Sequence, residues 1–106
     1  MAEPMKIRAT LQVDTADVRI LMQHPMETGQ RKDAKGAIVS MHFIQNVVIT
    51  YNGKTVLDAQ WSQAISRNPF LGLRVKGARA GDRISVTWTD NKGDTRTDEV
   101  AVTASS

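Results

Sequence analysis

The chain has 106 residues, of which 41% are hydrophobic and 24% charged, and its 14 basic and 11 acidic side chains give a formal net charge of +3. These values are typical of one soluble globular domain, predicted here over residues 1–106, and they exclude a disordered chain. The basic residues are scattered along the sequence and do not form the clustered stripe that nucleic-acid binding requires. The absence of cysteine excludes a disulfide, a thiolate metal site and a cysteine nucleophile.

Alternating apolar and polar residues predict two strands near the N-terminus. In residues 5–13 every second side chain is apolar, which is typical of a half-buried strand. A polar turn cluster at 14–17 precedes a second alternating strand at 18–22. Pro25 lacks the N–H that a ladder hydrogen bond needs, so we expect strand pairing to end before it.

A long loop between His24 and His42 separates these strands from the rest of the chain. Its first half has neither helical nor strand periodicity, and it carries Arg31, Lys32 and Lys35. Loops of this length are uncommon in compact domains and are usually functional or disordered. We therefore expect the functional surface to lie here, on a scaffold built by the remaining strands.

The hairpin that follows has the clearest local signal in the sequence. Asn52-Gly53 lies between two segments rich in branched and aromatic residues, 42–51 and 54–61, and favours a two-residue turn in which Tyr51 pairs with Lys54. Regular alternation from that turn gives one face with Ile44, Val48, Leu57, Ala59 and Trp61, and an opposite face with Phe43, Val47, Ile49, Tyr51 and Val56. Because both faces are apolar, we expect the second sheet to cover one and a partner protein the other.

The second half of the chain adds three more strands. We predict a helical turn at 62–67, a strand at 71–75, a turn at 77–82, a strand at 84–89, a hairpin loop at 90–94 and a last strand at 96–103. Seven short strands without a long amphipathic helix indicate an all-β fold, an immunoglobulin-like antiparallel β-sandwich of about seven strands with no disulfide. A small closed barrel is the alternative architecture.

Residues of catalytic type form no recognisable active site. His24 and His42 can meet across the loop, where they would suit zinc or copper. Glu27 or Asp33 would then supply an oxygen ligand, whereas the alternative is that both histidines anchor the loop through hydrogen bonds. Ser40 lies near His42 without an orienting acid, and no nucleophile elbow or glycine-rich phosphate loop is present. We therefore expect neither an enzyme nor a bound cofactor.

The remaining charges and aromatic residues limit the choice of partners. Eight cations could form a face for an acidic partner or a small anion, or could be solvated strand residues: Lys32, Lys35, Lys54, Arg67, Arg74, Lys76, Arg79 and Arg83. Two tryptophans and one tyrosine are too few for a platform that stacks single-stranded nucleic acid. No stretch approaches the roughly 18 apolar residues of a membrane span, and the first residues lack the apolar core of a signal peptide. The residues alone therefore predict a cytoplasmic protein that binds neither nucleic acid nor membrane.

A set of short motifs in fixed order and spacing resembles the SoxZ family. The resemblance runs from about Met5 to Val102. Its motifs are His24-Pro25-Met26-Glu27-Thr28-Gly29, Arg31-Lys32-Asp33, Gly36, His42-Phe43-Ile44, Asn52-Gly53-Lys54, Trp61, Asn68-Pro69, Lys76-Gly77-Ala78, Gly81-Asp82 and Trp88-Thr89-Asp90-Asn91-Lys92-Gly93-Asp94.

The resemblance implies a partner and a role. SoxZ-like proteins are immunoglobulin-like sandwiches that pair with SoxY in the SoxYZ sulfur carrier of bacterial thiosulfate oxidation. SoxY holds pathway intermediates on a cysteine at the end of a C-terminal arm, so this chain would be a structural and docking subunit that also meets the pathway enzymes transiently. The pair is thought to be exported already folded on the partner's twin-arginine signal, which makes the periplasm the expected location. A stand-alone metal- or anion-binding sandwich is the alternative function.

Candidate partner contacts lie on the long loop and on one face of the hairpin. Arg31, Lys32 and Lys35 would steer a partner, and Met26 would supply an adaptable apolar contact. The full set of candidates is His24, Met26, Arg31, Lys32, Lys35, His42, Phe43, Val47 and Ile49.

Overall fold

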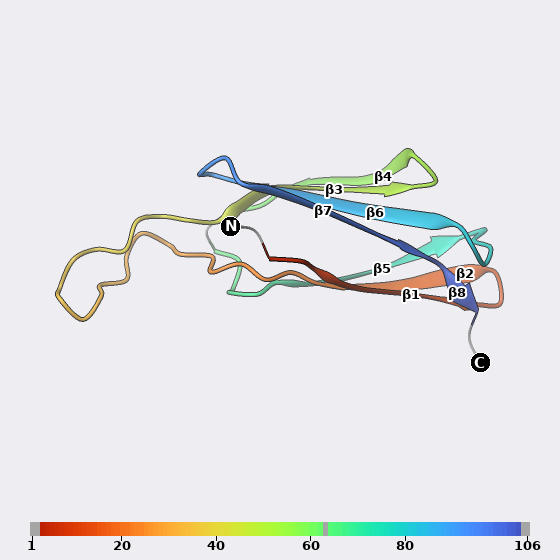
Figure 1. Cartoon of the computed structure of the whole chain (residues 1–106), viewed down its shortest axis with the longest axis horizontal. Helices are drawn as coiled ribbons and strands as arrows, with labels where there is room; N and C mark the ends of the chain where they lie inside the picture. The colour runs from red at the N-terminus through yellow and green to blue at the C-terminus, as the bar shows by residue number, and fades with distance from the viewer. Residues whose placement is uncertain (1–2, 63, 105–106) are drawn as a thin grey trace.

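Eight short strands form two facing sheets in the computed structural model, which describes residues 3–62 and 64–104 (Figure 1). In chain order the strands are β1 (Lys6–Gln12), β2 (Thr15–Leu21), β3 (Ile44–Tyr51), β4 (Lys54–Gln60), β5 (Phe70–Lys76), β6 (Arg83–Asp90), β7 (Thr95–Ala101) and β8 (Thr103–Ala104). One sheet has the order β5-β2-β1-β8 and the other β4-β3-β6-β7, and all neighbours are antiparallel except β1 and β8. Within the described ranges, no helix is long and apolar enough to cross a membrane.

The strand order is that of an immunoglobulin-like sandwich. β1, β2 and β5 take the places of strands A, B and E in that fold, and β3, β6 and β7 take those of C, F and G. The predicted all-β sandwich is therefore confirmed, with eight strands instead of about seven. The last predicted strand is divided at Val102, whose side chain is buried in the core and whose N–H donates to the carbonyl of Asp82.

The core lies between the sheets and is built from alternate residues of the inner strands. Val18 and Ile20 of β2 belong to the same buried cluster as Val86 and Trp88 of β6, and all four are at most 1% exposed. Full burial of one such side chain stabilises a fold by roughly 1.5–3 kcal/mol. The other members of the cluster are Met5, Ala9, Ala16, Met22, Met26, Ile44, Val47, Ile49, Ala78, Ile84 and Val102.

Two tight turns join neighbouring strands. Asn52-Gly53 forms the predicted two-residue hairpin, with positive φ at both residues (49° and 83°) and with Tyr51 paired to Lys54. The turn between β1 and β2 is shorter than predicted, and β2 begins at Thr15 instead of residue 18. Val13 in this turn has a φ of 62°, and a branched side chain is not a sequence signal for that conformation.

Two bulges in the pairing of β3 change the predicted faces of the hairpin. The register shifts between Ile49 and Thr50 against β4, and between Ile44 and Asn46 against β6. A bulge adds one residue to one strand, and a slip of one residue moves the following side chains to the other face. The side chains of this hairpin that pack in or against the core are therefore those of Ile44, Val47, Ile49, Tyr51 and Leu57.

The bulges correct the expectation that a partner covers an apolar outer face of this hairpin. Val47 and Ile49, both predicted to contact a partner, are 0% and 1% exposed and belong to the core of the chain itself. On the outside, Val48 lies opposite Asp58 and Thr87, which makes that side largely polar. The outer face of this hairpin is therefore not the apolar surface that the sequence predicted.

The segment between β2 and β3 leaves the sandwich as a long finger, defined here as residues 25–41 (Figure 1). It extends beyond one end of the sheets along the long axis of the molecule, which measures 53 × 25 × 21 Å. The radius of gyration is 15.7 Å, against about 13 Å for a compact domain of this length. The predicted long loop is thus the main feature outside the sheets.

The connection from β4 to β5 passes beside the base of the finger. The helical turn predicted at 62–67 includes residue 63, which lies outside the described residues; the Ile65 N–H donates to the carbonyl of Ser62 at 3.3 Å. Asn68 follows with a φ of 52°, and its N–H donates to the carbonyl of His24 at 2.9 Å. This connection therefore holds the first arm of the finger.

Candidate functional site

The finger is a two-armed hairpin with pairing between its arms. Near the base, Glu27 and His42 exchange two backbone hydrogen bonds, with N–O distances of 2.6 and 3.0 Å. Further out, Lys32 and Ile38 form an isolated antiparallel bridge. Backbone pairing at two levels gives the arms a fixed register.

Asp33 closes the tip of the finger. Its Oδ1 accepts hydrogen bonds from the N–H groups of Lys35 at 2.9 Å and Ala37 at 3.1 Å. Its carbonyl accepts the N–H of Gly36, whose φ of 83° suits glycine. Asp33 therefore shapes the turn, and it is not the metal ligand that the sequence allowed.

The outer half of the finger is exposed and combines cations with apolar side chains. Residues 30–38 are all exposed, and Ile38 and Met41 are 64% and 41% exposed. The Arg31 Nε donates to both carboxylate oxygens of Glu27 at 2.9 and 3.0 Å, which lowers the pKa of Glu27 below its usual value. Across the described ranges, the two lysines of the finger form no ion pair, so their charges are available to a partner.

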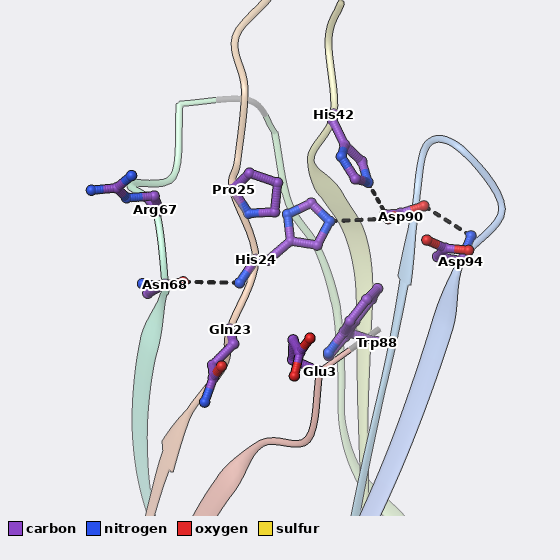
Figure 2. Close-up of a pocket in the computed structure, with 10 residues that line it drawn as sticks. All are labelled: Glu3, Gln23, His24, Pro25, His42, Arg67, Asn68, Trp88, Asp90 and Asp94. Carbon is purple, nitrogen blue, oxygen red and sulfur yellow. Dashed lines mark hydrogen bonds and ion pairs between the residues drawn. The ribbon is translucent and has the colours of Figure 1, made fainter. Parts of the chain in front are cut away.

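Both arms meet the sandwich at a buried cluster of three side chains, His24, His42 and Asp90 (Figure 2). The Nε2 of His24 lies 3.0 Å, and the Nε2 of His42 2.7 Å, from the same oxygen, Oδ2 of Asp90. The side chains of His24 and Asp90 are 2% and 0% exposed, and that of His42 is 22% exposed. Since Asp90 is the last residue of β6, one carboxylate oxygen ties both arms to a central strand.

Hydrogen bonds and burial set the charges of this His-Asp-His cluster. The Met26 N–H donates to the Nδ1 of His24 at 3.1 Å, so the proton of the neutral ring lies on Nε2 and points at Asp90. Burial lowers the pKa of His24 and thereby favours the neutral ring. Burial would raise the pKa of Asp90, but hydrogen bonds from both histidines and from the amides of Lys92 and Asp94 outweigh it, so the pKa lies below its usual value.

Two asparagines that were not predicted as site residues hold the arms on either side of the cluster. The Oδ1 of Asn68 accepts the N–H of His24 at 3.0 Å. The Oδ1 of Asn91 accepts the N–H of Phe43 at 2.8 Å, and its Nδ2 donates to the carbonyl of Met41 at 2.9 Å. Both asparagines lie in motifs that carry the family resemblance. The sequence indicates only that they are turn residues, because nothing near them in the chain predicts a hydrogen bond to the finger.

One potential ligand atom from each residue of the cluster lies within 4.8 Å of the other two, a spacing at which the three could hold a metal ion. A histidine that binds a metal donates its second ring N–H to an acceptor. The Nδ1 of His24 instead accepts an N–H from Met26, which leaves the ring proton on Nε2, the atom that would face the ion. Glu27, one of the two expected oxygen ligands, is paired with Arg31. The geometry therefore supports the alternative role for both histidines, which is to anchor the loop.

The nine predicted partner contacts fall into three groups. Three lie exposed on the finger: Arg31, Lys32 and Lys35. Four lie at its base, buried or half-buried: His24, Met26, His42 and Phe43. Two lie in the core: Val47 and Ile49. Met26, which was expected to offer an apolar contact to a partner, is only 5% exposed, whereas Ile38 and Met41 are exposed apolar side chains of the finger.

The motifs that resemble the SoxZ family lie in a part of the chain that a family model also matches. The model described as "Sulphur oxidation protein SoxZ" matches residues 5–101 of the 106-residue chain. The chain belongs to the SoxZ family. No curated protein matches the chain at a significant level. The SoxZ match covers the whole finger and all three members of the cluster, and it places the protein in sulfur oxidation.

Proposed function

We propose that this SoxZ-family chain is the non-catalytic docking subunit of a heterodimeric sulfur carrier. A SoxY-like sister subunit would hold the pathway intermediates on a cysteine at the end of its C-terminal arm, and the pair would present them to thiosulfate-oxidising enzymes. The family match, which supports a role in sulfur oxidation, is the observation that carries this proposal. The composition agrees with it, because a chain without cysteine offers no thiol to which a sulfur intermediate could be attached.

The finger supports docking as the contribution of this chain. Its exposed half offers apolar contact through Ile38 and Met41 beside the charges of Arg31, Lys32 and Lys35. Its base is held by the His-Asp-His cluster, and an arm ordered before binding loses little conformational entropy when it binds. We assign the finger as the surface that docks on the sister subunit.

Isothermal titration of the purified chain with its SoxY-like subunit tests this assignment. We expect a one-to-one complex that Ile38→Asp weakens by at least about tenfold, because a charge would replace an apolar contact in the interface. Val13→Asp is the matched control, since Val13 is 97% exposed on the β1–β2 turn, at the end of the sandwich away from the finger. Circular dichroism of both variants confirms that they fold.

The outcomes separate the role of the finger from the role of the subunit. A complex that tolerates Ile38→Asp as well as Val13→Asp would contradict docking through the finger. Failure of the native chain to bind any SoxY-like subunit from the same host would contradict the proposal that it belongs to a heterodimeric sulfur carrier.

The same proposal places the carrier in the periplasm, with export of the folded pair on the sister subunit's signal. Periplasmic and cytoplasmic fractions of the host, probed for this chain, test the location. Deletion of the sister subunit's signal should leave both subunits in the cytoplasm, and export of this chain without its sister would contradict the proposal.

A further inference from the structure

The outer surface of the β5-β2-β1 sheet carries a concentration of positive charge that does not follow from the small net charge of the chain. Alternate residues of these strands point into the core, and the positions between them are exposed or half-buried. Five outward residues are cations and one is acidic. This set, called the basic face, consists of Lys6, Arg8, Asp17, Arg19, Arg74 and Lys76. Of the eight cations singled out in the sequence, it contains only Arg74 and Lys76.

Little of this charge is balanced within the basic face. The Arg19 Nη2 lies 3.4 Å from the Oδ2 of Asp17, and this is the one ion pair on the face among residues 3–62 and 64–104. Arg8 lies directly opposite Arg19 in the antiparallel ladder. Like charges in that position destabilise a sheet. Carboxylates from another molecule would relieve this repulsion.

An apolar patch adjoins the cations at the end of the basic face nearest the finger. Phe70 is 64% exposed and lies opposite Leu21, which is 36% exposed. An atom of the Phe70 ring lies 3.6 Å from the point where a Cβ at Gly72 would stand, so the ring leans over that glycine on the outside of the sheet. Aromatic side chains and arginines are enriched together in protein interfaces.

The outer surface of the other sheet has a different character. Arg83, a cation on this surface, donates to the carboxylate of Glu99 at 2.9 Å. The surface is otherwise dominated by hydroxyl groups, those of Thr50, Ser85, Thr87, Thr89, Thr95 and Thr97. The positive charge is therefore concentrated on one side of the sandwich.

We propose that the basic face docks a second protein, whose surface presents carboxylates around an apolar side chain that packs against Phe70 and Leu21. The guanidinium groups of the face suit bidentate pairing with carboxylates. A phosphate backbone fits less well, because Asp17 lies among the cations and the apolar patch would meet no counterpart. This partner is distinct from the sister subunit assigned to the finger, so the inference goes beyond the proposed function.

Fluorescence anisotropy with a labelled short peptide, rich in glutamate and containing two leucines, tests the basic face on the full chain. We expect binding that weakens as salt rises, and a loss of about tenfold in affinity for Arg8→Gln with Arg19→Gln. The matched control removes two cations elsewhere, by Lys54→Gln with Arg83→Gln, and should change affinity by less than about twofold. Phe70→Ala should also weaken binding, with little change in the salt dependence.

Competing ligands and the sister subunit complete the test. Equal losses in the two double variants, or no binding of the peptide, would overturn the proposal. Tighter binding of a single-stranded oligonucleotide or of phosphatidylglycerol vesicles than of the peptide, at the same salt, would also overturn it. The double variant Arg8→Gln with Arg19→Gln should still assemble with the SoxY-like subunit, and the Ile38→Asp variant should still bind the peptide. Loss of assembly in the folded double variant would assign the basic face to the sister subunit instead.

Discussion

The sandwich and the finger are held in place by different interactions. The sandwich buries side chains such as Val47 and Trp88 between its sheets. The outer half of the finger is exposed, and the finger keeps its shape through backbone bonds between its arms and through one shared carboxylate at its base. The two regions can therefore be perturbed separately: a change in the core should unfold the whole chain, whereas a change at Asp90 should mainly release the finger.

The largest expected effect separates the two sides of β3. Val47→Lys places a charge at a position that is 0% exposed, and we expect it to lower the free energy of unfolding by about 3–5 kcal/mol. Val48→Lys is the matched control, because Val48 is half-buried on the outer side opposite Asp58, and it should cost less than about 1 kcal/mol. Urea unfolding followed by circular dichroism measures both. Equal losses would contradict the assignment of Val47 to the core and of Val48 to the outer side of the sheet.

An intermediate effect is expected at the base of the finger. Asp90→Ala removes the acceptor of four hydrogen bonds and leaves buried donors without partners, which should cost about 2–4 kcal/mol. Asp94→Ala, an exposed neighbour in the same loop, should cost less than about 0.5 kcal/mol. Hydrogen exchange should show loss of protection in residues 25–41 of Asp90→Ala, with the sandwich amides still protected. An equal loss of protection in the finger and in the sandwich would show that the two regions unfold together.

Acid should act on the base of the finger before it acts on the core. Burial lowers the pKa of His24 in the folded chain, so below the ordinary value of 6.5 the unfolded chain binds more protons and stability falls as pH falls. The lowered pKa of Asp90 adds a second loss below about pH 3.8, in the same direction. We expect the melting temperature to decrease on acidification through pH 6.5, and to decrease less in His24→Gln. An identical slope in that variant would assign the effect to another group.

The smallest effect on stability is expected at the exposed cations of the finger. Arg31→Gln with Lys32→Gln should change the free energy of unfolding by less than about 0.5 kcal/mol, because both side chains are exposed. Their charges should matter in association, so the affinity for the sister subunit should fall at low salt and become less sensitive to salt. Titration at two salt concentrations measures this. Affinity and salt dependence equal to those of the native chain would remove these residues from the interface.

The fold was predictable because its signals are local. Strand alternation and the Asn52-Gly53 turn each depend on neighbouring residues, and they located most strands to within two or three positions. The two bulges arise where β3 pairs with β4 and β6, their extra residues being Val56 of β4 and Gln45 of β3, and no local sequence signal indicates either. Regular alternation therefore assigned Val47 and Ile49 to the wrong surroundings.

The candidate site was predictable only in part, for the same reason. The length and charge of the loop identified the finger, and its two histidines were correctly considered as anchors. Their common partner, Asp90, lies 66 and 48 residues further along the chain, inside what looked like an ordinary hairpin loop. The basic face escaped notice because its cations come from three strands, and only their registers bring them together.

The reach of the finger has a hydrodynamic consequence. A particle of 53 × 25 × 21 Å meets more friction than a sphere of equal mass, so a single 11.7 kDa chain should leave a sizing column early. Its elution volume would then suggest a dimer or larger oligomer, although the eluting species is a single chain. Sedimentation equilibrium, which reports mass independently of molecular shape, is the appropriate way to count the subunits of any complex that this chain forms.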